Sequence, residues 1–173
     1  EPFVVKAAEI HYPRIPRPYW EHRIQVCKAL GMNTICIYIF WNIHEQQEGV
    51  FDFTGQNDVA EFCRLAQKNG MYVIVRPGPY VCAEWEMGGL PWWLLKKKDV
   101  RLREPDEFFM AAVDRFEQKV AEQLAPLTIQ QGGPIIMVQV ENEYGSYGEN
   151  KQYIAQIRDT LRKYWDKDGS KPT

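Results

Sequence analysis

Two short segments of this sequence place carboxylates beside aromatic and amide side chains, Glu84-Trp85-Glu86 and Glu141-Asn142-Glu143. Aromatic rings stack on the apolar faces of sugars, and carboxylates and amides hydrogen-bond to sugar hydroxyls. Cleavage of a glycosidic bond needs two carboxyl groups, one to protonate the leaving oxygen and one to attack or to activate water. Charged strand ends that only face solvent, and tryptophan-rich loops that only cover a core, explain the same composition equally well.

Glu141 and Glu143 have to be distinguished from each other. In an extended strand they share one face with Gln139, whereas Asn142 faces the other way. Asn142 and Glu143 can therefore reach one pocket only if the strand bulges or ends there. The alternation alone does not decide which glutamate would be catalytic.

The elements that must position these segments alternate between strand and helix. Hydrophobic patterns predict strands at residues 3–8, 34–40, 72–75 and 135–140, and helices at 19–30, 58–69, 105–126 and 151–165. The first helix is expected to bury Trp20, Ile24, Cys27 and Leu30 on one face. This β-α order predicts parallel strands joined by right-handed crossovers, either in an open doubly wound sheet or in half of an eight-fold barrel.

The loops favour the barrel. The first predicted strand is followed by the bulky segment 9–14 instead of a glycine-rich phosphate loop, which argues against a nucleotide site. Segments 41–57 and 76–104 are long, and loops beyond about 12–15 residues are usually functional. Both follow the carboxyl ends of strands, where barrel enzymes build their active sites.

Composition excludes several other classes. The chain of 173 residues has 21 Lys and Arg against 23 Asp and Glu, and its only dense basic run is Lys96-Lys97-Lys98, so no nucleic-acid partner is expected. No apolar stretch approaches the ~20 residues of a membrane span. Three histidines without paired spacing argue against a metal site, and no cofactor is expected. The cysteines lack CxxC spacing and are expected to be free: Cys27, Cys36, Cys63 and Cys82.

Four motifs together identify a family: Glu9-Ile10-His11-Tyr12 and the segments at 38–42, 76–91 and 138–145. They closely resemble the β-galactosidases of glycoside hydrolase family 35, from the first predicted strand to the fourth. The motif at 76–91 is long and highly specific, so chance is a poor explanation. The resemblance implies an α/β fold, a (β/α)8 TIM barrel whose first four βα units this chain holds. Residues 1–173 would form the N-terminal part of the catalytic domain.

The same resemblance implies a retaining exo-β-galactosidase that removes terminal β-linked galactose. The acid/base of the family is the glutamate of an Asn-Glu pair that closes the fourth strand, which corresponds to Glu143 here. Glu141 would be a neighbour of the site. The residues that would bind galactose, Cys82 and Ala83 chiefly through backbone atoms, are Tyr38, Cys82, Ala83, Glu84 and Asn142.

The family nucleophile is a glutamate of a later strand, so none is expected among residues 1–173, and this chain alone is expected to be inactive. Glu1 in place of a methionine and the polar end at 170–173 are expected of a trimmed piece of a longer chain. Its expected partners are a β-galactoside glycan, the remainder of the barrel and C-terminal β domains. Family habit favours an extracytoplasmic location, whether periplasmic, secreted or lysosomal.

Alternatives stay open at this point. The chain could belong to a non-catalytic carbohydrate-binding protein on a degenerate barrel, or to a glycosidase of the same clan with a different sugar. A metal-dependent barrel hydrolase is a more distant third. Individual residues also have purely structural explanations: Tyr38 as part of the core, Glu84 as an ion-pair partner of Arg76, and Asn142 as a turn cap.

Overall fold

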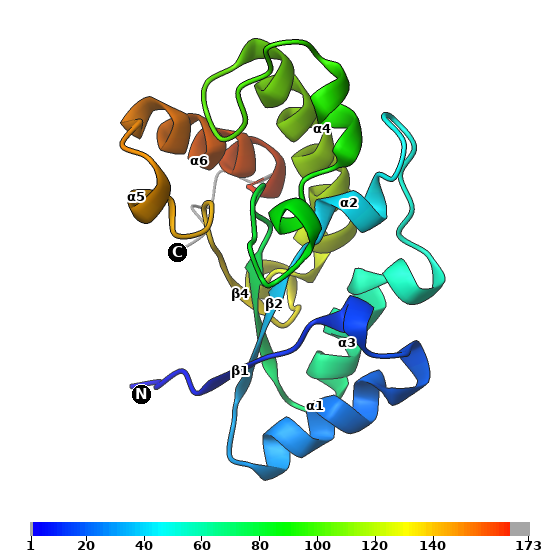
Figure 1. Cartoon of the computed structure of the whole chain (residues 1–173). Helices are drawn as coiled ribbons and strands as arrows, with labels where there is room; N and C mark the ends of the chain where they lie inside the picture. The colour runs from blue at the N-terminus through cyan, green and yellow to red at the C-terminus, as the bar shows by residue number, and fades with distance from the viewer. Residues whose placement is uncertain (1, 167–173) are drawn as a thin grey trace.

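The computed structural model describes residues 2–166, and it contains one parallel sheet. Its strands are β1 (Ala7–Glu9), β2 (Thr34–Tyr38), β3 (Tyr72–Arg76) and β4 (Ile135–Val138), and each strand pairs with its predecessor in the order β1-β2-β3-β4 (Figure 1). A doubly wound sheet reverses its strand order at a switch point, whereas a barrel adds strands in sequence. The sheet therefore has the topology of the first four strands of a barrel.

Four long helices follow the strands in the same order: α1 (Trp20–Ala29), α3 (Val59–Lys68), α4 (Glu107–Leu124) and α6 (Lys151–Trp165). Two single-turn helices, α2 (Trp41–His44) and α5 (Tyr144–Tyr147), lie in the loops after β2 and β4. The 3₁₀ turns are Tyr12–Arg14, Arg17–Tyr19, Gly55–Asn57, Glu86–Gly89, Trp92–Lys96, Ala125–Leu127 and Ile129–Gln131. Figure 1 shows α1 beside α3 and α4 beside α6, and both pairs are in contact.

Local sequence explains where three of these helices begin. The side chains of Asp58, Asp106 and Asn150 accept hydrogen bonds from backbone N–H groups in the first turns of α3, α4 and α6. Such caps satisfy donors that have no partner inside the helix. The predicted helix positions at 58–69, 105–126 and 151–165 are thereby confirmed to within a few residues.

The two faces of the sheet differ in exposure. Ile35 and Ile37 of β2 and Val73 and Val75 of β3 are fully buried. The opposite face carries Cys36, Ile74 and Met137 in register across β2, β3 and β4, and these side chains range from half-buried to exposed. By alternation, the last residues of β2 and β3, Tyr38 and Arg76, belong to this second face. The sheet therefore brings polar and aromatic side chains together at its carboxyl end.

Three details of the predicted elements are wrong. The first strand contains only Ala7–Glu9, because the residues before it do not form a ladder with β2, and Val4 is 68% exposed. Leu30 lies just beyond α1 and is 72% exposed, so it is not part of the buried face. The second strand ends at Tyr38 and the fourth at Val138, each two residues earlier than expected.

Candidate functional site

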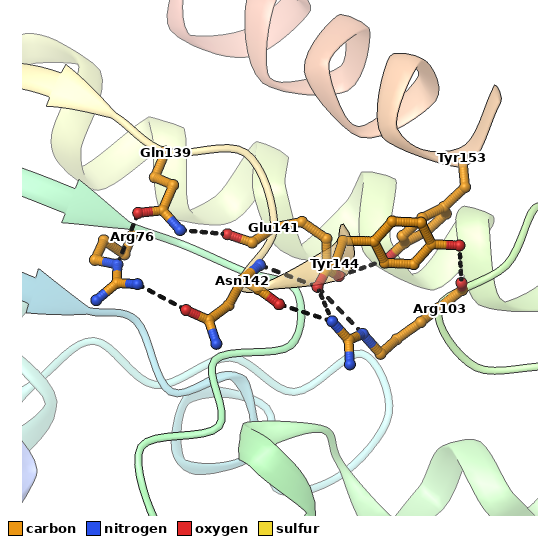
Figure 2. A network of polar contacts seen from close by, with 7 residues as sticks. All are labelled: Arg76, Arg103, Gln139, Glu141, Asn142, Tyr144 and Tyr153. Atoms are coloured by element: carbon orange, nitrogen blue, oxygen red, sulfur yellow. Dashed lines mark hydrogen bonds and ion pairs between the residues drawn. The ribbon is translucent and has the colours of Figure 1, made fainter. Parts of the chain in front are cut away.

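Arg76, the last residue of β3, joins the carboxyl ends of all the strands. Its Nη1 atom lies 3.2 Å from Glu9 Oε1 of β1, and its guanidinium carbon lies 4.2 Å from the ring centre of Tyr38 of β2. Beyond β4, Nε donates to Gln139 Oε1 at 2.8 Å and Nη2 donates to Asn142 Oδ1 at 2.7 Å (Figure 2). Two sequence-predicted binding residues, Tyr38 and Asn142, are thus brought together by an arginine that the sequence pattern did not single out for this role.

The segment after β4 resolves the ambiguity between its two glutamates. Glu141 and Glu143 both have left-handed backbone conformations, with φ of 58° and 48°. This breaks the alternation that would put their side chains on one face of a strand. Glu141 is 1% exposed and Asn142 2%, whereas Glu143 is exposed to solvent.

Glu141 is held by a buried ion pair. Arg103 donates to its Oε1 from Nη2 at 2.6 Å and from Nε at 3.2 Å, and the Tyr153 hydroxyl donates to Oε2 at 2.6 Å. Arg103 Nη2 also donates to the Asn142 carbonyl at 2.8 Å (Figure 2). The carboxylate of Glu141 therefore serves the structure, and it is not available to a substrate.

Glu143 has a different environment. Its side chain makes no hydrogen bond or ion pair with any residue among 2–166, while its carbonyl accepts from the Ser146 N–H at 3.0 Å. Burial raises the pKa of Tyr38, Arg76 acts in the opposite direction, and the negative charge of Glu143 adds to the rise. The carboxylate is thus close enough to Tyr38 to interact with it electrostatically.

The loop after β3 carries the other predicted binding residues. Cys82, Ala83 and Glu84 are three consecutive residues with positive φ, at 60°, 54° and 47°. Left-handed non-glycine residues are strained, and they gather at active sites and ligand clamps. Ala83 is buried, Cys82 and Glu84 are exposed, and Arg14 Nη2 donates to the Glu84 carbonyl at 2.8 Å. The ion pair of Arg76 is with Glu9, so the structural alternative for Glu84, a pair with Arg76, does not hold.

Arg103 is enclosed by aromatic rings. Its guanidinium carbon lies 4.0 Å from the ring centres of both Tyr80 and Tyr147. Gly88 supports this arrangement from behind, because a Cβ atom there would lie 1.9 Å from Tyr80 Cε2. Gly88 also has φ of +61°, which favours glycine. Arg103 is the most important residue that the sequence did not reveal, since nothing in its own segment distinguishes it.

A second buried network follows β2. The imidazole of His44 is hydrogen-bonded to the Tyr12 hydroxyl at 2.6 Å and to the Asp52 carbonyl at 2.9 Å. Burial lowers the pKa of His44 to about 4, so the ring is neutral at ordinary pH. Glu45 is fully buried and accepts hydrogen bonds from Trp41 Nε1 at 2.7 Å and from the Gly49 N–H at 2.9 Å.

Other ligand classes find little support in the part of the chain that the structure describes. Residues 2–166 contain no group of three or more histidine, cysteine, aspartate or glutamate side chains placed to hold a metal ion. None of the described helices has the length and apolarity needed to cross a bilayer. The four cysteines are free thiols: Cys27, Cys36, Cys63 and Cys82.

Comparison with known proteins finds relatives that match most of this chain. The family model described as glycosyl hydrolases family 35 matches residues 1–171. A β-galactosidase of Xanthomonas manihotis is 51% identical over 91% of this chain and 26% of its own length. A β-galactosidase of Mus musculus is 52% identical over 85% of this chain and 23% of its own length. The chain therefore spans about a quarter of the length of the curated relatives it matches.

Solved structures support the fold. An exo-β-1,4-mannosidase from an Opitutaceae bacterium superposes with a TM-score of 0.74 at 15% identity, covering 95% of this chain and 30% of the other. A GH5_18 protein from Streptomyces cattleya gives 0.71 at 12% identity, covering 91% and 41%. The parallel sheet thus has the fold of the first four βα units of a (β/α)8 barrel.

Proposed function

We propose a function on the premise that this chain belongs to glycosyl hydrolases family 35. The whole protein is a retaining exo-β-galactosidase that releases terminal β-linked galactose from glycans or galactosides. The observation that carries this proposal is the contrast between two neighbouring glutamates at the end of β4. Glu141 is occupied by Arg103 and Tyr153, whereas the exposed carboxylate of Glu143 is free to meet a substrate.

In this mechanism Glu143 is the general acid and base. It protonates the glycosidic oxygen as the bond to the leaving group breaks, while a second carboxylate attacks the anomeric carbon. Glu143, now ionised, removes a proton from the water that hydrolyses the galactosyl-enzyme. The two carboxyl groups of a retaining enzyme lie about 5–5.5 Å apart. We assign the nucleophile to no residue of this chain.

We propose that the sugar is held by residues from three strand ends. Tyr38 is the last residue of β2, and Asn142 lies in the loop after β4. The loop after β3 contributes Cys82, Ala83 and Glu84. Asn142 Oδ1 accepts from Arg76, which orients the amide N–H groups towards a sugar hydroxyl. Cys82 and Ala83 have small side chains and a left-handed backbone. Their main-chain atoms are therefore suited to direct contacts with a ligand.

We also propose that residues 1–173 are the N-terminal part of the catalytic domain and act together with the remainder of the barrel and with C-terminal β domains. The support is that β-galactosidases about half identical in sequence are roughly four times as long as the matched segment. An extracytoplasmic location remains a prediction from the family resemblance.

The test is Glu143→Gln in the full-length protein. Glutamine keeps the shape of the side chain but has no proton to give, so kcat/KM on an alkyl galactoside with a poor leaving group should fall by about 10²–10⁴-fold. The loss should be much smaller on an activated aryl galactoside, which needs little acid assistance. Thermal unfolding of both proteins should coincide.

Glu149→Gln is the matched control, because Glu149 is another exposed glutamate of the same loop and has no assigned role. Near-normal turnover of the poor substrate by Glu143→Gln would exclude Glu143 as the acid. A panel of aryl glycosides tests the substrate, and a wild-type preference for another sugar would contradict the galactosidase assignment.

A further inference from the structure

The buried carboxylate of Glu141 is saturated by partners from three separate segments. Its Oε1 atom accepts from Arg103 and from the Asn142 N–H at 3.0 Å, and its Oε2 atom accepts from the Tyr153 hydroxyl. Arg103 lies in the segment before α4, and Tyr153 lies in the first turn of α6. One side chain thus ties the loop after β4 to the approaches of two helices (Figure 2).

The backbone that carries Asn142 and Glu143 requires such support. Glu141 and Glu143 both have left-handed backbone conformations, which are strained for residues other than glycine. This conformation persists only when surrounding contacts enforce it. Arg103 supplies two of those contacts, since its guanidinium donates to the Glu141 carboxylate and to the Asn142 carbonyl.

Arg103 is itself fixed in place. Its ring contacts with Tyr80 and Tyr147 restrict the guanidinium, and the Tyr144 hydroxyl donates to the Arg103 carbonyl at 3.2 Å. Because Tyr144 directly follows Glu143, the chain on both sides of the proposed acid is attached to Arg103. A shift of this arginine would therefore move Glu143.

Charge around the pair also favours a fixed geometry. Glu117 of α4 is fully buried, and neither of its carboxyl oxygens has a hydrogen-bond partner among the described residues. Burial and the nearby Glu141 raise the pKa of Glu117 well above its usual range. With Glu117 protonated, one arginine faces one ionised carboxylate, and the charges of Arg103 and Glu141 balance.

We propose that Arg103 and Tyr153 are positioning residues, which act through Glu141 to hold Glu143 in line with the glycosidic oxygen. This inference rests on the proposed function. Neither residue is among those assigned to bind the sugar, so their effect should be greatest where bond cleavage most needs acid assistance. A displacement of about 1 Å in a catalytic group can reduce the rate by about 100-fold.

The test uses Tyr153→Phe and Arg103→Lys in the full-length protein, with aryl galactosides of graded leaving-group pKa. The value of kcat/KM reports bond cleavage, so a displaced acid should lower it most for the poorest leaving group. We expect a fall of at least about 10-fold there and less than about 3-fold for the most activated substrate. The slope of log kcat/KM against leaving-group pKa should become steeper in both variants.

Tyr164→Phe is the matched control, because Tyr164 is a tyrosine of the same helix whose hydroxyl bonds to Asp114 of α4, far along α6 from Tyr153 and Glu141. Its slope should equal that of the wild type. Thermal unfolding identifies any loss of folded protein, which would lower kcat/KM equally for all substrates. If Arg103→Lys does not fold, Tyr153→Phe decides, because it removes only one hydroxyl group.

A uniform fall across all leaving groups, or an unchanged slope in folded Tyr153→Phe, would overturn the positioning role. Those results would leave the proposed function intact as long as the wild type cleaves galactosides and Glu143→Gln loses its activity on the poor leaving group. A wild type without galactosidase activity would instead refute the proposed function, and the positioning role with it.

Discussion

The loops after β2 and β4 both bury a glutamate, but they hold it in opposite ways. Glu45 in the first loop receives only neutral donors, and both belong to residues four positions away in the sequence. Glu141 in the second loop is paired with a charged arginine 38 positions away and a tyrosine 12 positions away. The carboxylate of Glu45 is thus held from within its own loop, whereas that of Glu141 depends on distant parts of the fold.

This difference distinguishes the loop after β2, which packs against the core, from the loop after β4, which carries the proposed acid. Burial raises the pKa of Glu45, and its neutral partners offset only part of that rise. A loop of this kind can cap the aromatic core without exposing any reactive group. The second loop neutralises one carboxylate with Arg103 and thereby presents the next glutamate in a strained conformation at the surface.

The largest expected effect comes from Glu141→Ala, which leaves the charge of Arg103 buried without a partner. Removal of one member of a buried pair costs about 3–5 kcal/mol. Urea unfolding should show a loss of this size in the free energy of unfolding. The double variant Arg103→Met/Glu141→Leu should recover most of it, because two apolar side chains leave no charge buried. A double variant as unstable as Glu141→Ala would show that shape, not charge, dominates there.

The second effect concerns His44, whose pKa burial lowers from 6.5 to about 4. Between these values the unfolded chain binds a proton that the folded chain does not, so stability should decrease as the pH falls from about 6.5 to about 4. The full contribution is about 3 kcal/mol. Urea unfolding across this range should show the slope in the wild type, and His44→Asn should reduce it. The exposed His22→Asn is the control and should keep the slope.

Glu117→Gln should produce an effect of opposite sign with pH. The folded-state pKa of Glu117 is raised, so the wild type loses stability as the pH rises above the unfolded value of about 4.5, by at most about 1.4 kcal/mol per pH unit. The variant should therefore gain relative to the wild type between pH 5 and pH 8. Glu122→Gln, an exposed change on the same helix, should show no such gain.

The smallest effect is expected for Glu45→Gln. Glutamine can still accept one of the two neutral hydrogen bonds and carries no charge to desolvate, so the loss should be about 1 kcal/mol or less. Chemical denaturation at pH 7 measures it beside Glu141→Ala. Equal losses for the two substitutions would remove the distinction between the loops.

Hydrophobic periodicity made the order of strands and helices predictable from sequence. Asp58, Asp106 and Asn150 act locally, so they can be recognised without tertiary structure. Arg103 could not be found in this way, because its partners lie far along the chain and become neighbours only when the sheet forms. The left-handed backbone at Glu141 was equally hidden, since that residue type rarely adopts it.

The proposed site likewise contains residues that the sequence identified and residues that it did not. Asn142 and Glu143 were singled out by resemblance to a family, and their roles stay predictions. Arg76 was considered only as an ion-pair partner of Glu84, yet it joins residues from every strand end. Hydrophobic alternation identifies which face a side chain occupies, but it says nothing about which charges meet at the end of a sheet.

Gly88 has a consequence for how relatives of this chain can diverge. A methyl group at that position would overlap the Tyr80 ring, and the ring would have to leave its present place against Arg103. In a lineage that replaced this glycine first, Arg103 would therefore be less firmly held until a compensating change arose. Tyr80, Gly88 and Arg103 should therefore be conserved together or replaced together. A family tree in which the three positions vary independently would contradict this.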